Sequence, residues 1–208
     1  MDFHFGEVFD AIAQAIPENE ALVFRDRRLS FAELGERSRR LANLLGDHGL
    51  QVRAERGQLA GHESGQDHLA LYLYNGNEYI EGMLGAFRAR VAPLNVNYRY
   101  VEEELLYLFQ NSRSRAVLYH AEFAPVLAAI RDRLPDLELL VQVADDSGEA
   151  LLPGALDYEE ALAGASPEAP AVTPSADDLY ILYTGGTTGM PKGVLWRSGD
   201  IYPAAMGG

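Results

Sequence analysis

The sequence predicts an α/β fold in which a parallel-type sheet is flanked by helices. Between residues 68 and 143, short β-rich runs alternate with segments whose apolar residues recur at helical spacing. Such a βαβαβ succession is typical of a parallel sheet with helices on its faces. The composition allows a sizeable core, because 48% of the 208 residues are apolar and 23% are charged. The absence of cysteine excludes disulfide scaffolds and thiol nucleophiles.

The first fifty residues predict two helices separated by a hairpin. Residues 6–16 repeat apolar side chains on one helical face and end at Pro17, and residues 22–29 favour two short strands around a polar turn. Ser30 and Glu33 then form a Ser-x-x-Glu capping box, which predicts a helix start. Leucines at helical spacing continue this second helix as far as the glycines at 46 and 49.

Residues 50–67 are rich in glycine and polar residues, and they predict an irregular surface loop. The alternating elements follow this loop. Strands are expected at 68–74, 91–94, 115–119 and 137–143, and helices at 75–90, 101–110 and 123–134. Tyr72 and Tyr74 share one face of the first of these strands, where packing against a helix is the expected role.

The regular alternation stops after residue 143, and this predicts the domain organisation. Residues 1–165 are expected to form an N-terminal α/β subdomain, with a short last helix at 157–163. Residues 166–177 are a proline-rich, acidic connector, and residues 178–208 are expected to begin a second subdomain with a strand, a loop and a strand.

Charge and hydropathy exclude several classes of function. Lysine and arginine number 17 against 31 acids, so the net charge is −14, and no basic stripe is present for binding nucleic acid. No apolar run approaches the roughly 18 residues that a membrane span needs. The N-terminus has no signal-peptide pattern, so we expect a cytoplasmic protein.

For a few other side chains, a catalytic or metal-binding role can be weighed against a structural one. The residues His62, Glu63, Asp67 and His68 match no metal-binding motif, and they are expected to be solvated loop residues. Trp196 is expected in the core. Ser198 has no base at catalytic spacing and is expected to be a helix N-cap.

A strand at 178–183 runs into the loop Thr-Gly-Gly-Thr-Thr-Gly-Met-Pro-Lys-Gly, and this combination predicts a phosphate-binding loop. Glycines let successive backbone N–H groups converge on an anion, threonine hydroxyls add neutral donors, and a lysine adds a mobile positive charge. The candidate ATP- and phosphate-binding residues are Thr184, Gly185, Gly186, Thr187, Thr188, Gly189 and Lys192. Lys192 is the chain's single lysine. The alternative interpretation is a glycine-rich hairpin turn without a ligand.

Two widespread phosphate motifs do not fit this loop. The pattern Gly-x-x-x-x-Gly-Lys-Ser/Thr fails because Pro191 precedes the lysine and Gly193 follows it. The pattern Gly-x-Gly-x-x-Gly fails because Gly185 and Gly186 are adjacent.

The segment Tyr183-Thr-Gly-Gly-Thr-Thr-Gly-Met-Pro-Lys-Gly-Val194 resembles the signature phosphate loop of the adenylate-forming superfamily, whose members include acyl-CoA synthetases, peptide-synthetase adenylation domains and luciferases. Three upstream segments are similar to further landmarks of that superfamily, so the resemblance spans nearly the whole chain. They begin at Ser30 (Ser-Phe-Ala-Glu-Leu), Leu71 (Leu-Tyr-Leu-Tyr-Asn-Gly-Asn-Glu-Tyr) and Arg90 (Arg-Val-Ala-Pro-Leu-Asn-Val-Asn-Tyr).

The resemblance implies an ATP-dependent acyl-CoA synthetase, an acid–thiol ligase of fatty acid metabolism. Its substrates would be a carboxylic acid with a fatty or related acyl chain, ATP with Mg²⁺, and coenzyme A. Three alternatives stay open at this point: a peptide-synthetase adenylation domain, a non-catalytic nucleotide-binding module, and a structural domain that binds no ATP.

The sequence departs from the superfamily in two respects. The loop usually begins Thr-Ser-Gly, and Gly185 stands at the serine position. Members are also more than twice as long, with an adenine-binding segment, a ribose-binding carboxylate and a C-terminal catalytic lysine further downstream. We therefore expect an N-terminal fragment that needs the C-terminal portion of the same enzyme and is inactive alone. No catalytic residue or metal ligand is assigned within it.

Overall fold

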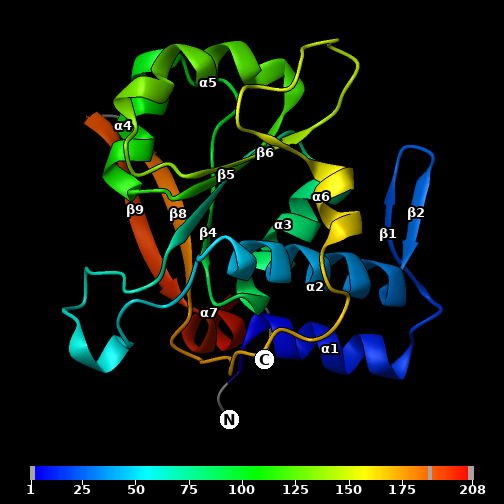
Figure 1. Cartoon of the computed structure of the whole chain (residues 1–208). Helices are drawn as coiled ribbons and strands as arrows, with labels where there is room; N and C mark the ends of the chain where they lie inside the picture. Colours follow the sequence, from blue (N-terminus) through cyan, green and yellow to red (C-terminus); the bar gives the residue numbers. More distant parts are fainter. Residues whose placement is uncertain (1–2, 187–188, 206–208) are drawn as a thin grey trace.

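Seven of the strands that the structure describes form one central sheet, and helices lie on both faces of this sheet (Figure 1). The structure is a computed structural model that describes residues 3–186 and 189–205. The sheet order is β7-β6-β5-β3-β4-β8-β9. Neighbouring strands are parallel except for the final pair, β8 and β9. The strands are β3 (His68–Tyr72), β4 (Ala92–Asn95), β5 (Ala116–His120), β6 (Leu139–Val143), β7 (Leu156–Asp157), β8 (Leu179–Gly186) and β9 (Gly189–Arg197). The predicted α/β class with a parallel-type sheet is confirmed.

The helices divide between the two faces of the sheet. One face is covered by α2 (Phe31–Asp47), α3 (Asn77–Arg88) and α6 (Tyr158–Gly164), with α1 (Phe5–Ala15) packed on α2 and α3. The other face is covered by α4 (Glu102–Ser112) and α5 (Ala124–Ile130). A separate hairpin, β1 (Glu20–Phe24) and β2 (Arg27–Ser30), precedes α2, and α7 (Ser198–Ala205) follows β9. The helix predicted at 123–134 is divided, because 3-10 turns at Ala121–Phe123 and Arg131–Arg133 flank α5.

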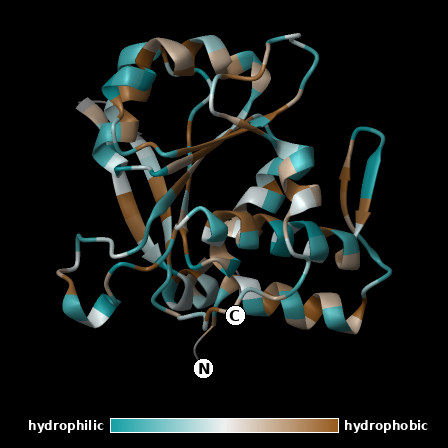
Figure 2. Ribbon diagram, in the orientation of Figure 1, coloured by the Kyte–Doolittle hydropathy of each residue, from teal (hydrophilic) through white to brown (hydrophobic). Residues whose placement is uncertain are grey.

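Alternation along β3 explains why this strand is buried on both sides. Leu69 and Leu71 pack into the core beneath α2 and α3, whereas Ala70 and Tyr72 pack into the core beneath α4 and α5. Figure 2 shows the resulting brown, hydrophobic colour along the central strands. The ring of Tyr72 stacks on Phe123 with centroids 4.2 Å apart, which confirms the predicted packing role of this tyrosine.

The predicted capping box at the start of α2 is present. Glu33 N donates to Ser30 Oγ at 3.2 Å, and Ser30 N donates to Glu33 Oε2 at 2.8 Å. The hydrogen bond from the Ser30 backbone, supported by the Ser30 hydroxyl, lowers the pKa of Glu33. Two donors that would otherwise lack partners at a helix N-terminus are thereby satisfied.

The proline-rich connector lies along α2 and leads the chain back to the sheet. Arg39 Nε donates to the Pro167 carbonyl at 2.7 Å, and Asn43 Nδ2 donates to the Ser166 carbonyl at 2.8 Å. β8 then pairs with β4 at Ile181 and Leu94, so residues on both sides of the connector share one sheet. The division into two subdomains at 166–177 stays a prediction.

Ion pairs hold part of the loop at 50–67 against the rest of the protein, which its composition does not predict. His62 and Glu63 are exposed, as expected, but the expectation of solvation is wrong for Asp67 and His68. Asp67 is 6% exposed and pairs with Arg53 and Arg115 at 2.8 and 2.7 Å. These are contacts between residues far apart in the sequence, which local composition does not reveal. No helix among residues 3–186 and 189–205 is long and apolar enough to cross a membrane.

Candidate functional site

The predicted phosphate-binding segment lies at the outer end of the β8–β9 hairpin. Thr184 and Lys192 are cross-strand partners, and both side chains are exposed. Gly186 pairs with Gly189, with an irregularity between Thr184 and Gly186. The structure therefore brings the threonine hydroxyl and the lysine to one place on the hairpin.

The remaining candidate residues are distributed around this pair. Gly185 and Gly186 end β8, and Gly189 begins β9. Thr187 and Thr188 lie outside the described residues. Hairpin pairing is the arrangement that the alternative interpretation expected, but a glycine-rich tip can also present backbone N–H groups to an anion. The phosphate-binding role of these seven residues stays a prediction.

The two faces of the hairpin differ in burial. Ile181 and Leu195 pack against the core beneath α4, whereas Lys192 and Val194 are exposed on the opposite face. Trp196 shares the exposed face and is 39% exposed, so the prediction that it lies in the core is wrong. Ser198 is buried, and its hydroxyl donates to the Asp178 carbonyl at 3.0 Å, which corrects its predicted role as an N-cap.

A crevice of about 560 Å³ borders the hairpin at the carboxyl ends of β3 and β4. The connections that leave these two strands run along opposite faces of the sheet, through α3 and α4. This is the position where open α/β sheets bind ligands. Asparagines and tyrosines dominate the lining, which consists of Leu73, Asn75, Tyr79, Asn95, Val96, Asn97, Tyr98, Tyr100, Glu104, Tyr183, Met190 and Pro191. The last three come from the hairpin itself.

Apart from Glu104, the polar side chains that line this crevice are neutral. Among the described residues, Asn95 Oδ1 is a buried acceptor without a hydrogen-bond donor. Burial raises the pKa of Tyr79 to about 12, with nearby Tyr180 adding to it. Burial also raises the pKa of Tyr183 to about 12, with Tyr107 as the neighbouring group. These phenols stay protonated near neutral pH, so the crevice can offer donors and acceptors without a charge change.

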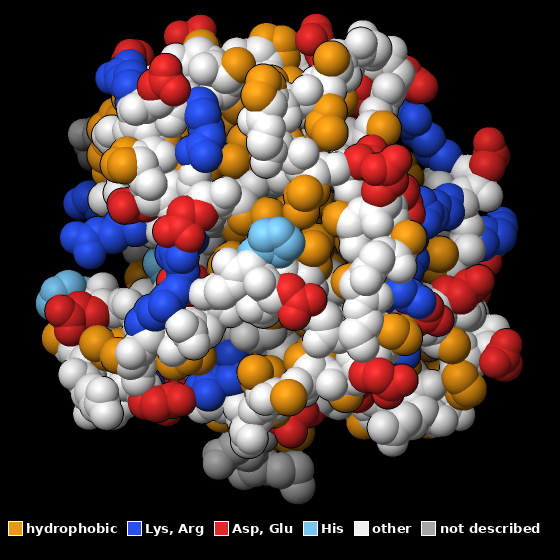
Figure 3. Space-filling view, in the orientation of Figure 1, with side chains coloured by type: hydrophobic (Ala, Val, Ile, Leu, Met, Phe, Trp, Pro, Cys, Tyr) orange, Lys and Arg blue, Asp and Glu red, His pale blue; other side chains and the backbone are white. Residues whose placement is uncertain are grey.

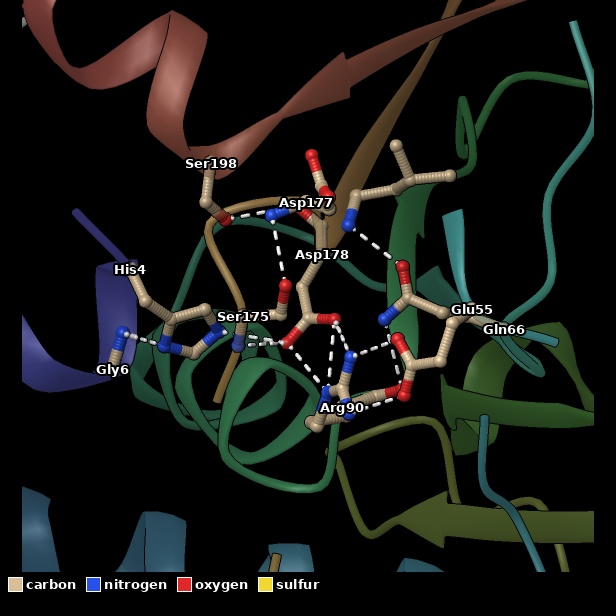
Figure 4. A network of polar contacts seen from close by, with 10 residues as sticks. His4, Gly6, Glu55, Gln66, Arg90, Ser175, Asp177, Asp178 and Ser198 are labelled. Atoms are coloured by element: carbon tan, nitrogen blue, oxygen red, sulfur yellow. Dashed lines mark hydrogen bonds and ion pairs between the residues drawn. The ribbon is translucent and has the colours of Figure 1, made fainter. Parts of the chain in front are cut away.

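An ionic network, buried except at Glu55, fixes the base of β8 (Figure 4). Arg90 Nε donates to both carboxylate oxygens of Asp178 at 3.0 Å, and its two terminal nitrogens bind Glu55, each at 3.0 Å. His4 Nδ1 accepts from Gly6 N at 3.2 Å, and His4 Nε2 lies 3.5 Å from Asp178 Oδ2, just beyond hydrogen-bonding geometry. The network ties the N-terminus and the α3–β4 turn to the start of the hairpin.

A larger hollow of about 940 Å³ lies at the opposite, amino-terminal edge of the strands. Several of its polar side chains bind one another: Asp67 pairs with Arg115, and His68 Nε2 lies 2.7 Å from Ser64 Oγ. On the face in Figure 3, acidic and basic side chains are interspersed among apolar ones. The crevice at the carboxyl ends of β3 and β4 is the better candidate site, because open α/β sheets bind ligands at that edge. The described residues contain no group of three or more potential metal ligands.

Sequence reasoning missed the side chains that surround the hairpin. Asn95 ends β4, and Asn75 and Asn97 lie within three residues of the ends of β3 and β4. That position at the carboxyl edge of a parallel sheet is a usable signal. Tyr107 and Asn111 of α4 form hydrogen bonds with the hairpin, but they carry no such signal. The contact of a helical residue with a distant hairpin depends on the tertiary arrangement.

The comparisons with known proteins agree with this geometry. The family model described as AMP-binding enzyme matches residues 9–207. The chain belongs to the AMP-binding enzyme family. The medium-chain acyl-CoA ligase Mig of Mycobacterium avium is 56% identical over 201 residues, which are 97% of this chain and 36% of that protein. The 3-oxocholest-4-en-26-oate–CoA ligase of Rhodococcus rhodochrous is 37% identical, over 100% of this chain and 35% of that protein.

Solved structures of this AMP-binding family have the same architecture. The N-terminal domain of FACL13 from Mycobacterium tuberculosis superposes with a TM-score of 0.75 at 28% identity, over 94% of this chain and 44% of that one. The chain spans about a third of the length of the curated relatives it matches. The family match over residues 9–207 thus includes the sheet and its hairpin.

Proposed function

We propose that this chain carries the phosphate-binding hairpin of an ATP-dependent, AMP-forming acyl-CoA synthetase. The observation that supports this most strongly is the pairing of Thr184 with Lys192 on the exposed face of a glycine-rich hairpin. The adjoining crevice and the membership of the AMP-binding family support it further. The 56% identity to a medium-chain acyl-CoA ligase favours a medium-chain fatty acid as the acyl substrate.

In the proposed reaction, a carboxylate oxygen of the acid attacks the α-phosphorus of ATP. The bond from that phosphorus to the bridging oxygen breaks, and pyrophosphate leaves with the electron pair. The sulfur of coenzyme A then attacks the acyl carbon, AMP leaves, and the thiol proton passes to solvent. These steps yield an acyl-adenylate and then a thioester.

The chain's own contribution is to stabilise the leaving group. Negative charge builds on pyrophosphate as the bond breaks, and donors that are already in position stabilise that charge. Lys192 and the Thr184 hydroxyl would hold the β- and γ-phosphates, together with Thr187, Thr188 and the backbone N–H groups of the three glycines. Mg²⁺ would be carried by the ATP phosphates, since the hairpin supplies no carboxylate ligand.

The substitution Lys192→Ala tests this proposal. The variant should bind MgATP and pyrophosphate more weakly by about 1.5–3 kcal/mol, because one charge-assisted contact is lost. Its melting temperature should not change, because the Lys192 side chain is exposed. Isothermal titration calorimetry of each ligand measures the loss of affinity, and thermal unfolding measures the melting temperature.

Arg197→Ala is the matched control, because Arg197 is a second exposed cation of β9 but is bound by Asp177 and Asp200. This variant should bind ATP as the unchanged chain does. A large drop in the melting temperature of Lys192→Ala would indicate unfolding instead. Undiminished ATP binding in that variant would remove Lys192 from the site.

A further inference from the structure

The β8–β9 hairpin is paired with β4 only near Ile181, and its outer half, which carries Lys192, extends beyond the end of β4. β8 pairs with β4 at Ile181, β4 ends at Asn95, and β9 is the last strand in the sheet order. An isolated two-stranded ribbon is marginally stable in water. The position of the outer half must therefore depend on contacts outside the sheet.

Helix α4 supplies two such contacts. Tyr107 Oη donates to the Pro191 carbonyl at 3.1 Å, and Tyr183 Oη donates to Asn111 Oδ1 at 2.8 Å. Tyr107 and Asn111 are four residues apart, so they lie on the same side of α4. One hydrogen bond reaches each strand of the hairpin.

The Tyr183 ring extends this attachment to the residue after Lys192. A Cβ added to Gly193 would lie 3.1 Å from the Tyr183 ring, so the ring sits directly against the backbone at Gly193. Lys192 is therefore flanked on one side by Pro191, which Tyr107 holds, and on the other side by Gly193, which Tyr183 covers.

We infer that Tyr107 and Asn111 are positioning residues that hold the backbone on both sides of Lys192 and thereby set the affinity of the hairpin for phosphate. This inference rests on the proposed function. Neither side chain need touch the ligand. Their effect would come from keeping the lysine where the phosphate binds, since a preordered site loses less freedom on binding.

Tyr107→Phe removes the hydroxyl and keeps the ring. We expect about 3- to 10-fold weaker MgATP binding, which is the effect of one neutral hydrogen bond. In a Lys192→Ala background the same substitution should cause no further loss, because Tyr107 acts through the lysine. Calorimetry on the four chains of this double-mutant cycle measures the coupling. Asn111→Ala, at an exposed position, should behave in the same way.

Tyr119→Phe is the matched control. It removes a tyrosine hydroxyl that binds Gln142 at 2.8 Å in the core, away from the hairpin, and should leave ATP affinity unchanged. Hydrogen exchange provides a readout without ligand: the amides of residues 189, 190, 192 and 193 should exchange faster in Tyr107→Phe and at the original rate in Tyr119→Phe.

The outcomes separate this inference from the proposed function. If Lys192→Ala leaves ATP binding unchanged, the proposed function is refuted together with any effect of α4 on phosphate affinity. If Lys192→Ala weakens ATP binding but Tyr107→Phe does not, or if the two losses simply add, the positioning role is refuted and the proposed function stands. Unchanged exchange at 189–193 in Tyr107→Phe would refute the attachment itself.

Discussion

Asp178 illustrates how one buried carboxylate organises distant parts of the chain. Its side chain is 3% exposed, it binds Arg90, and it accepts from Ser175 N at 3.1 Å. Asp178→Ala would leave the guanidinium of Arg90, which is 13% exposed, with Glu55 as its remaining partner. We expect a loss of about 3 kcal/mol or more in the free energy of unfolding, measured by denaturant titration.

The neighbouring carboxylate provides the comparison. Asp177 is 42% exposed and pairs with Arg197 at 3.0 Å on the surface. Asp177→Ala should change the free energy of unfolding by about 0.5 kcal/mol or less, because exposed ion pairs contribute little. Equal losses for the two variants would mean that burial does not distinguish them.

For single residues, the sequence predicts which side chains suit a ligand better than it predicts which side chains are buried. Lys192 and Thr184 can be chosen in advance because lysine and threonine within a glycine-rich loop are suited to phosphate. Asp67 and Trp196 could not be placed correctly. Burial of a loop carboxylate depends on arginines far away in the sequence, and exposure of a tryptophan depends on which face of a hairpin meets the core.

Among the elements, α2 and α3 depend on a glycine at their contact. A Cβ on Gly85 would lie 2.8 Å from Leu41 Cγ, and Leu41 is fully buried. Gly85→Ala should therefore push the helices apart and lower the free energy of unfolding by about 1–3 kcal/mol, measured by chemical denaturation.

Gly46 is the matched glycine in α2, because an added Cβ there would have no atom within 4 Å. Gly46→Ala should raise the free energy of unfolding by about 0.4–1 kcal/mol, since alanine restricts the unfolded chain and favours the helix. A stabilising effect at Gly85 as well would contradict the close approach of the two helices.

Periodicity and caps predict most elements of the fold, since these signals lie within each segment. The capping box at Ser30 and the strands that became β3, β4, β5 and β6 are examples. The two-residue strand β7 and the pairing of β8 with β4 have no local signal. The order of strands follows from packing between segments, so the sequence predicts a parallel sheet without fixing which strand lies beside β8.

For the whole molecule, histidines with a lowered pKa couple stability to pH, and the buried His4 and the partly buried His120 are two of them. Burial is the main cause that lowers the pKa of His4 and of His120, while the attraction of nearby carboxylates opposes it. His4 Nδ1 accepts from Gly6 N, and His120 Nδ1 accepts from Tyr74 N at 3.1 Å. Both acceptors are lost when the ring is protonated.

The sign follows from the lowered pKa. As the pH decreases, the histidines of the unfolded chain take up protons near the ordinary pKa of about 6.5, before those of the folded chain do. The contribution of these histidines to the free energy of unfolding is therefore fully present above that pH and decreases as the pH falls below it. The free energy of unfolding should thus be lower at pH 5.5 than at pH 7.5. His4→Asn keeps an N-cap acceptor without titrating, and it should reduce this difference. An unreduced difference in that variant would exclude His4 as a source.

The position of β4 has a consequence for how the chain emerges during synthesis. In the finished sheet β4 lies between β3 and β8, but β8 is made only after the residues of α4, β5, α5, β6 and α6. Until then β4 is an unpaired edge strand of the nascent protein, and unpaired edge strands promote aggregation between chains. Pro93 within β4 offers no N–H to a stray partner, which limits that hazard. Among the strands of this sheet, β8 is therefore the one that covers the exposed edge of β4, and it does so only after the intervening residues have been made.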